Sequence, residues 1–399
     1  MSNPVFAMLG RNAGKFAVVA LLAVPAAISL YNARTKPNDP NLAQLPPRPA
    51  TTAELLEMPP KLNAWINDHF GYRVDLVKFN NRMRFKLFHE FPSVQMSAGR
   101  HGRYFLSAHG TSMPPYQAVT TVCSRGVARD STIPHLNRLF GAFHAAGLAP
   151  KLLVVPSAPV VYPEDLPPFL ERECASDITP VGAVIASPAL DPAAAAAMFY
   201  PLKEMREIKK SAVLFPKSWF HWTGDGLDQV ARLSLTHFWQ RPLDQAPALA
   251  QKKRVQIADV SHLFDGILLE SETIEPDLDK SGVKGCWGGE CFPEIADIST
   301  TLRDVSRFDN PKAPARRLLI ISDSFGSKVS AWYARYYRHV EQFATNGVDQ
   351  LTPEQLESFK TYIYRERADT DILILYHDGG AMYDVLRLGT ERLLPAPKA

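Results

Sequence analysis

The chain has 399 residues, of which 46% are hydrophobic and 21% are charged, and its formal net charge is +3 at pH 7. This composition is typical of a globular protein with a substantial buried core, and it excludes an intrinsically disordered chain. The small charge excess, without a basic cluster interleaved with aromatic residues, argues against a nucleic-acid partner.

The N-terminus has the pattern of an export signal or a signal anchor. Arg11 and Lys15 precede an uncharged, mostly apolar run over residues 16–31. The run falls short of the roughly 20 residues that usually span a bilayer, and Pro25 interrupts it. Because no unambiguous cleavage site follows, we expect residues 1–34 to remain as an anchor in the inner membrane, with the body in the periplasm.

A proline-rich segment over residues 35–60 follows and favours a semi-extended tether. From residue 61 to 91, apolar residues at approximate helical spacing predict helices, with an interruption at Gly71. Arg73 is a polar position in this stretch and a candidate substrate contact. We expect residues 61–399 to form one domain.

Glycines and apolar runs then predict strands. Residues 98–106 have a glycine-turned hairpin pattern, and strand-like runs follow at residues 151–156, 212–215, 254–260, 317–321 and 371–376. Because helical segments separate most of these runs, the sequence predicts an α/β fold with a mainly parallel sheet and helices on both faces. Functional sites in such sheets form at the carboxyl ends of the strands.

The chain contains four cysteines. Cys286 and Cys291 lie in a short glycine-containing loop, and in an exported protein this spacing predicts a local disulfide. Cys123 and Cys174 could form a second bridge or remain thiols. No metal site is expected, because the loop offers Glu290 but no nearby histidine. The sequence has no dinucleotide, phosphate-loop or HExxH motif, so it implies no cofactor.

Two short segments carry groups that suit acyl transfer. Ser324 follows an apolar run and precedes a helical pattern, which places a hydroxyl on a strand-to-helix turn near backbone N–H groups. His221 precedes another helical pattern, with Thr223 as its expected N-cap. An imidazole can accept the serine proton, since its pKa lies near neutrality. Taken singly, each segment is also typical of helix capping and core packing.

The order of these segments resembles that of the SGNH-hydrolase-like family of alginate O-acetyltransferases and related exopolysaccharide acetylation proteins. The residues that carry the resemblance are Trp65-Ile66-Asn67-Asp68 with Phe70 and Arg73, the hairpin at 99–106, Val155-Pro156 with Val161-Tyr162-Pro163, His221-Trp222-Thr223, and Asp323-Ser324-Phe325. The resemblance implies a three-layer fold, Ser324 as nucleophile and His221 as base. It further implies acetyl transfer to an exopolysaccharide hydroxyl, with a membrane-bound O-acyltransferase as the acetyl supplier.

The sequence departs from this family at one position. Trp219 occupies the place of the aspartate that orients the histidine, and losing that aspartate in a serine protease lowers the rate by about four orders of magnitude. Three carboxylates are candidate substitutes: Asp225 in the predicted helix start, Asp323 beside the serine, and Asp378 after the last strand. Asp225 and Asp323 are also ordinary helix-start and turn residues.

Two further functions stay open at this stage. Replacement of the catalytic acid favours a non-catalytic member that binds glycan or acts as a scaffold in a polysaccharide secretion complex. In that case Trp219, Trp222 and Trp287 would be sugar platforms, although core packing explains tryptophans equally well. A secreted acetyl esterase would use the same serine and histidine with water as the acceptor.

Overall fold

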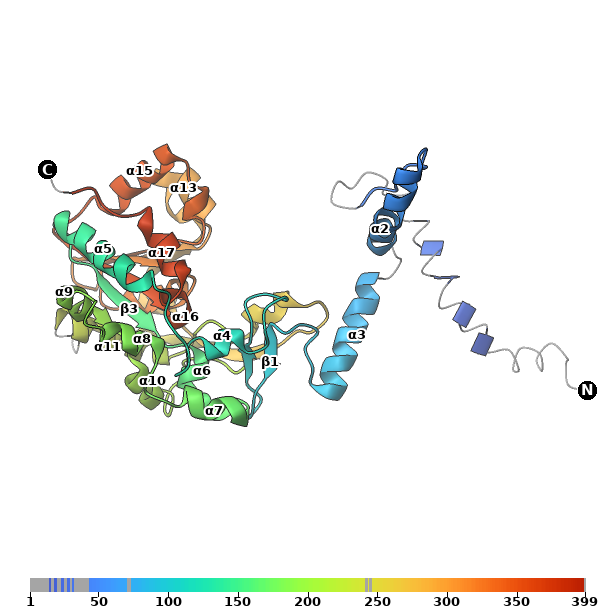
Figure 1. The fold of residues 1–399 in the computed structure, drawn as a ribbon. Helices are drawn as coiled ribbons and strands as arrows, with labels where there is room; N and C mark the ends of the chain where they lie inside the picture. The colour runs from blue at the N-terminus through green and yellow to red at the C-terminus, as the bar shows by residue number, and fades with distance from the viewer. Residues whose placement is uncertain are drawn as a thin grey trace, which may run out of the picture. The chain divides into compact units, whose positions relative to one another are not determined.

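The computed structural model describes residues 43–69, 73–240, 243 and 246–397, together with isolated positions between residues 14 and 31. Its contacts divide the chain into two units (Figure 1). The first contains residues 1–88 with 264–267, and the second contains residues 89–263 with 268–399.

The first unit contains helices α2 (Thr52–His69) and α3 (Arg73–Phe88), and no residue of α2 is buried. Helix α2 begins inside the segment that was expected to be an extended tether. The physical reason is local: Ala, Glu, Leu and Met after Thr52 are strong helix formers, and the Thr51 hydroxyl accepts the Glu54 N–H at 3.2 Å.

Most of the expected N-terminal anchor lies outside the described residues, as does the side chain of Arg73. Of the helices that the structure describes, none is both long enough and apolar enough to cross a membrane.

The second unit is built on a seven-stranded sheet with the order β4-β3-β11-β9-β10-β8-β7. Its strands are β3 (Lys151–Val155), β4 (Met198–Phe199), β7 (Lys284–Trp287), β8 (Val305–Asp309), β9 (Arg317–Ser322), β10 (His339–Ala344) and β11 (Thr370–His377). The strands from β4 to β10 in this order pair in parallel, whereas β8 pairs antiparallel with both β10 and β7. The predicted mainly parallel sheet is thus confirmed.

Two predicted strands are not in this sheet. Residues 212–215 form a loop, and β5 (Gln251–Ile257) pairs antiparallel with β6 (Glu270–Pro276) in a separate two-stranded sheet. Strand β5 carries Lys252, Lys253 and Arg254, and most of its residues are exposed. Charged side chains of this kind do not fit the interior of a sheet that is covered on both faces. The expected hairpin is present as β1 (Met96–Ala98) and β2 (Tyr104–Leu106).

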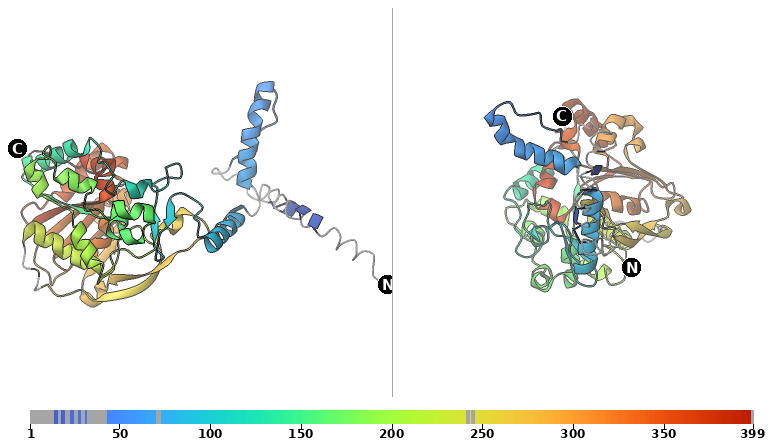
Figure 2. Two further views of the ribbon diagram at one scale, coloured as in Figure 1. Left: turned by 60° about the horizontal axis from the view of Figure 1, so that its bottom comes forward. Right: turned by 90° about the vertical axis from the view of Figure 1, so that its right-hand side faces the viewer.

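Helices cover both faces of the main sheet and make three layers (Figures 1 and 2). The helices of the second unit are α4 (Gln117–Thr120), α5 (Thr132–Ala145), α6 (Ala158–Val161), α7 (Pro168–Cys174), α8 (Pro180–Ile185), α9 (Pro192–Ala196), α10 (Leu202–Ile208), α11 (Gly226–Trp239), α12 (Leu278–Ser281), α13 (Ala296–Leu302), α14 (Gly326–Tyr333), α15 (Pro353–Ile363), α16 (Asp378–Ala381) and α17 (Asp384–Glu391). Short 3₁₀ turns complete it: η1 (Pro163–Asp165), η2 (Asp259–Leu263), η3 (Gly289–Cys291), η4 (Pro293–Ile295) and η5 (Val348–Gln350).

Alternate residues of each central strand enter two separate cores. In β9, Leu318 and Ile320 pack in the core formed with α10, α11 and α14, whereas Leu319 and Ile321 pack in the core formed with α5, α13, α15 and α17. This is the period-2 pattern of a strand that is covered on both faces. All six residues of β9 are buried. This burial fixes the end of the strand, and therefore the position of the residues that follow it at the edge of the sheet.

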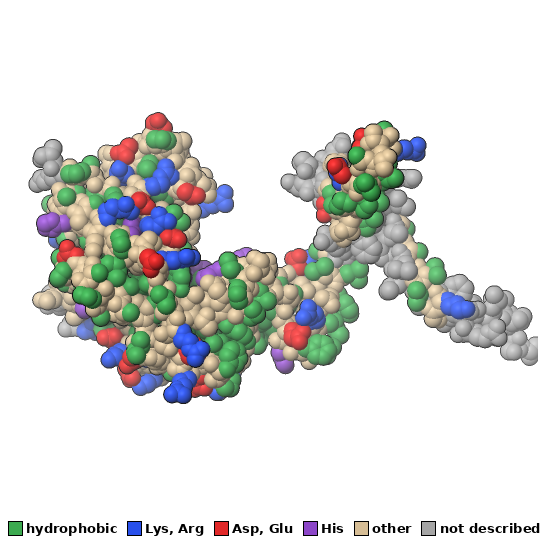
Figure 3. All heavy atoms as spheres, in the orientation of Figure 1, with side chains coloured by type: hydrophobic (Ala, Val, Ile, Leu, Met, Phe, Trp, Pro, Cys, Tyr) green, Lys and Arg blue, Asp and Glu red, His purple; other side chains and the backbone are tan. Residues whose placement is uncertain are grey.

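Two disulfides and a mixed surface charge complete the second unit. Cys286 bonds to Cys291, and Cys123 bonds to Cys174. On the face shown in Figure 3, basic and acidic side chains are interspersed, in keeping with the small net charge.

Candidate active site

The turn after β9 presents Ser324 at the carboxyl edge of the sheet. Asp323 begins the turn, and its Oδ1 accepts the Phe325 N–H at 2.9 Å. Helix α14 starts directly afterwards at Gly326, where a Cβ atom would lie only 2.1 Å from the Ser322 hydroxyl oxygen. The tight approach of the helix to the strand therefore requires glycine. Ser324 itself is half-buried, and in the described part of the chain its backbone N–H has no hydrogen-bond partner.

The loop between α10 and α11 brings His221 to this turn. Trp222 is fully buried, and its indole N–H donates to the Phe325 carbonyl oxygen at 2.7 Å. The same loop packs the ring of Phe220 edge-on against Phe325, with 5.4 Å between ring centroids. These two contacts join the histidine loop to the serine turn. His221 Nε2 consequently lies 2.7 Å from the Ser324 Oγ.

The carboxylate that contacts the other side of His221 comes from Asp259, the first residue of η2. His221 Nδ1 lies 2.5 Å from the Asp259 Oδ2, which also accepts the His221 backbone N–H at 2.8 Å. The Asp259 Oδ1 accepts the Phe220 N–H at 3.0 Å. Both carboxylate oxygens thus bind the histidine loop, and they fix its backbone and its ring together.

Electrostatics favour an ionised Asp259. Burial would raise the pKa of this carboxyl, but the hydrogen bond and charge of His221, with the N–H groups of His221 and Phe220, lower it below its usual value. An ionised carboxylate at Nδ1 requires the proton on that nitrogen. Nε2 is then left as an acceptor for the serine hydroxyl.

The site is open to solvent, since the side chains of His221 and Asp259 are 24% and 18% exposed. Serine, histidine and carboxylate in hydrogen-bonded sequence can activate a hydroxyl for attack on an ester carbonyl. No group of three or more His, Cys, Asp or Glu side chains in the described part of the chain is arranged to hold a metal ion.

The three carboxylates proposed from the sequence do not orient His221. Asp225 Oδ1 accepts the Val213 N–H at 2.9 Å and thereby holds the start of the same loop. Asp378 accepts the N–H groups of Ser157 and Gly379. Asp323 accepts from Phe325 and from a second histidine, His377. Asp259 was missed because it lies 38 residues from His221 in the sequence and inside the run over residues 254–260 that was predicted to be a strand.

Neither candidate sugar platform beside the histidine has the required exposure. Trp222 is 0% exposed and Trp219 is 6% exposed. The Lys328 Nζ lies over the Trp219 ring, 5.5 Å from its centre. Its indole N–H is buried and has no hydrogen-bond partner among the described residues. Both rings are therefore packed inside the protein around the site. This corrects the expectation that they would stack against a sugar.

A second Asp–His pair lies beside the nucleophile. His377 ends β11, and its Nδ1 lies 2.6 Å from the Asp323 Oδ2, which also accepts the His377 backbone N–H at 3.0 Å. Its ring stacks on Phe325 with 4.8 Å between centroids. Burial would lower the pKa of His377, but the charge and hydrogen bond of Asp323, with the charge of Asp378, raise it overall.

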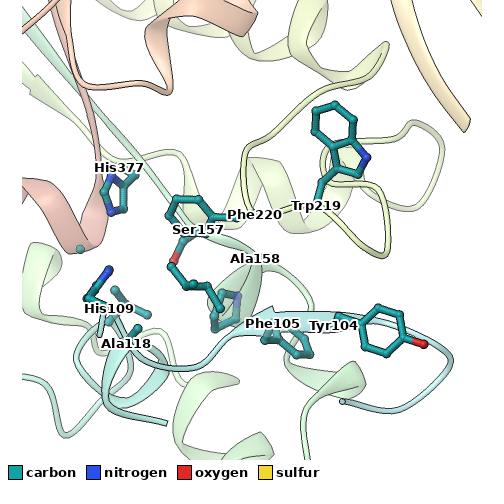
Figure 4. A pocket seen from close by; sticks show the side chains of 13 residues that line it. Tyr104, Phe105, His109, Ala118, Ser157, Ala158, Trp219, Phe220 and His377 are labelled. Atoms are coloured by element: carbon teal, nitrogen blue, oxygen red, sulfur yellow. The ribbon is translucent and has the colours of Figure 1, made fainter. Parts of the chain in front are cut away.

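His377 also lines a small pocket of largely aromatic and apolar side chains (Figure 4). In that view, His109 and His377 lie at one end of the pocket, and Tyr104 and Trp219 lie at the other. Burial and the charge of His377 lower the pKa of His109. The pocket therefore brings together, near the serine turn, two imidazoles whose pKa values are shifted in opposite directions.

No protein-family model matches this sequence, and no curated protein matches it. Among solved structures, a DHHW family protein from Eubacterium siraeum is 12% identical with a TM-score of 0.48, over 68% of this chain and 92% of that chain. AlgX from Pseudomonas aeruginosa is 11% identical with a TM-score of 0.43, over 76% of this chain and 65% of that chain. The O-acetyltransferase domain of AlgJ from Pseudomonas putida is 13% identical with a TM-score of 0.38, over 72% of this chain and 92% of that domain. We therefore base the assignment of activity on the geometry of the site and on the residue motifs.

Proposed function

We propose that this protein is an exported O-acetyltransferase that carries an acetyl group on Ser324 and passes it to a hydroxyl group of an exopolysaccharide. The observation that carries the proposal is the continuous hydrogen-bonded series from Ser324 Oγ through His221 to Asp259, at 2.7 Å and 2.5 Å, in an open position. The resemblance of the residue motifs to the exopolysaccharide acetylation family supports the choice of acetyl group and polymer.

In the first half of the reaction, Ser324 Oγ attacks the carbonyl carbon of the acetyl donor while His221 Nε2 takes its proton. The donor's leaving group departs with that proton, and acetyl-Ser324 remains. In the second half, a sugar hydroxyl gives its proton to His221 and attacks the acetyl carbonyl, and Ser324 leaves and is reprotonated. Asp259 keeps the imidazole in one tautomer and stabilises the imidazolium formed in each half. The N–H of Ser324, which has no hydrogen-bond partner among the described residues, can donate to the oxyanion.

The N-terminal pattern supports a periplasmic location with an anchor in the inner membrane. A membrane-bound O-acyltransferase partner would supply acetyl groups from the cytoplasmic side. Asp259 also removes the main reason for a degenerate, non-catalytic role, since that role rested on the replacement of the family's aspartate by Trp219. An esterase would share the first half-reaction and differ in using water as the acceptor.

The test is to treat the full-length chain with a small activated acetyl ester and to locate the acetyl adduct by mass spectrometry of peptides. We expect the adduct on Ser324 and its loss in Ser324→Ala. The exposed Ser211 lies outside the site, so Ser211→Ala serves as the matched control and should keep the adduct. Equal labelling of wild type and Ser324→Ala would refute the proposal. Turnover that increases with added polysaccharide would favour transfer over hydrolysis.

A further inference from the structure

Helix α3 is held through one of its faces by a short loop of the same unit. Asn81 is buried, and its side-chain N–H donates to the Asp265 carbonyl oxygen at 2.8 Å. Beside this bond, a Cβ atom on Gly266 would lie only 2.6 Å from the Lys78 Cα, so the loop passes directly over the helix backbone. The face of α3 that carries Lys78 and Asn81 is therefore occupied within the protein.

The opposite face of α3 carries four large apolar side chains. Leu76, Phe79, Met83 and Leu87, here called the apolar stripe, have the spacing i, i+3, i+7, i+11 that places side chains on one side of a helix. Met83 follows Asn81 by two positions, or about 200° around the helix axis, so the stripe points away from the loop. The four residues are between 39% and 62% exposed. A row of exposed apolar side chains of this kind indicates an interaction surface.

The same helix carries the positive charge of the protein. It contains five basic residues and one acidic residue, Asp75, so its formal charge of +4 exceeds the +3 of the whole chain. Helix geometry places Arg82 and Lys86 along one border of the apolar stripe and Arg84 along the other. Long basic side chains in such positions can reach outward with their charged ends while their apolar stems stay on the surface that the stripe contacts.

These features together favour a lipid surface as the occupant of the stripe. Anionic headgroups complement the basic borders, whereas a second copy of α3 would bring like charges together. The six charged residues of α3 exclude passage through the hydrocarbon core, but an apolar stripe between cations fits the plane of the membrane interface. In the sequence, the helix also follows the uncharged run over residues 16–31, which has the pattern of a membrane anchor.

We propose that α3 lies on an anionic phospholipid membrane, with the apolar stripe inserted at the level of the headgroups. In this arrangement Arg82, Arg84 and Lys86 contact lipid phosphates. The contact is a second attachment to the membrane, separate from the expected N-terminal anchor, and it does not require that anchor to be retained. The inference is independent of acetyl transfer, so it stands or falls separately from the proposed function.

The test measures where α3 lies in full-length protein that has been reconstituted into vesicles, because the N-terminal run is expected to bind lipid in every variant. All four cysteines form disulfides, so an introduced cysteine is the only free thiol and can carry a fluorescent label. Met83→Cys places the label in the apolar stripe. Val74→Cys is the matched control, since Val74 is also exposed but lies nine positions away, on the opposite side of the helix. We expect lipids with brominated acyl chains to quench the label at position 83 and to leave the label at position 74 unquenched.

The role of the basic residues is tested with two lipid compositions. Quenching at position 83 should be strong in vesicles that contain phosphatidylglycerol and weak in vesicles of phosphatidylcholine alone. With the anionic vesicles, Arg82→Gln/Lys86→Gln should lower the ratio of lipid-bound to free helix about tenfold. Lys203→Gln/Lys210→Gln removes the same charge from exposed positions of the second unit and should leave the ratio unchanged. Equal helix content by circular dichroism confirms that the variants are folded.

Three results would overturn the inference. The first is no quenching at position 83 with either lipid, and the second is equal quenching at positions 74 and 83. The third is a label at position 83 that is shielded from iodide in the buffer but is not quenched by brominated lipid, which would show that a protein covers the apolar stripe. Quenching that is the same with and without phosphatidylglycerol would contradict the requirement for anionic lipid.

Discussion

Replacement of Asp259 by asparagine tests the central feature of the site, because both oxygens of this carboxylate accept hydrogen bonds from the histidine loop. Oδ2 accepts from the His221 backbone N–H and from the ring nitrogen, and Oδ1 accepts from the Phe220 N–H. An asparagine side chain has one acceptor oxygen and one donor NH₂ group. In either orientation, the NH₂ group meets a backbone N–H that needs an acceptor.

The two orientations have different chemical consequences. If the NH₂ group faces the ring, Nδ1 must become an acceptor, and the proton moves to Nε2, where it blocks transfer from Ser324. If the NH₂ group faces Phe220, the tautomer is kept but the loop loses a hydrogen bond and the negative charge that stabilises the imidazolium. The corresponding change in serine proteases lowers kcat by about four orders of magnitude, or about 5 kcal/mol of activation free energy. We expect a loss of this order for Asp259→Asn.

The assay is single-turnover formation of acetyl-Ser324 from an activated acetyl ester, with Ser324→Ala as the background. Asp225→Asn is the matched control, since Asp225 bonds the Val213 N–H and does not contact His221. This control should cost about 1 kcal/mol of stability and leave the rate close to wild type. A rate for Asp259→Asn within tenfold of wild type would refute the role of Asp259. An equal loss in Asp225→Asn would show that the loop, rather than the triad, sets the rate.

Three further predictions concern stability. Burial and the charge of nearby Arg138 lower the pKa of His135 from 6.5 to about 4, so the unfolded chain takes up this proton first as pH falls. The free energy of unfolding should therefore decrease by about 3 kcal/mol from neutral pH to pH 4, and urea unfolding of His135→Gln should lack that component. Replacing Cys123 and Cys174 by serine opens a loop with a sequence separation of 51 residues and should cost about 4 kcal/mol in the same assay. Arg317→Met leaves the Oε2 of the buried Glu341 without its 2.6 Å partner, while Arg307 and Arg365 still bind Oε1. It should cost about 3 kcal/mol, and adding Glu341→Gln should not recover this loss, because those two arginines would then lose their carboxylate.

The position of the nucleophile can be predicted from sequence because its signals are local. The apolar run of β9 is continuous, and a turn residue, a serine and a glycine follow it in order. Each of these residue types is expected where a buried parallel strand is followed by a tight turn and the start of a helix. Period-2 packing into two cores likewise follows from the strand runs themselves. The serine turn and the two-sided packing of the strands can therefore each be predicted from a short stretch of sequence.

The orienting carboxylate could not be predicted in the same way, because its place depends on a strand that is not part of the main sheet. The run over residues 254–260 was interpreted as one more buried strand, with Asp259 inside it. In the structure β5 ends at Ile257, and Asp259 begins η2 two positions later. The charged residues of β5 are the signal that this run is exposed. With a strand end at residue 257, Asp259 would have fallen just beyond it, where site residues usually lie.

The two Asp–His pairs near Ser324 show why adjacency in sequence is a poor guide to a catalytic role. Asp323 directly precedes the nucleophile in the sequence. Its carboxylate oxygens, however, already accept hydrogen bonds from Phe325 and His377. A carboxylate that holds the turn in this way has no oxygen positioned for His221. Asp259 is distant in sequence and holds the base instead, so the turn and the base are fixed by separate acids. Each acid can therefore keep its partner in place without competition from the other, while the contacts of Phe220 and Trp222 with Phe325 join the two segments.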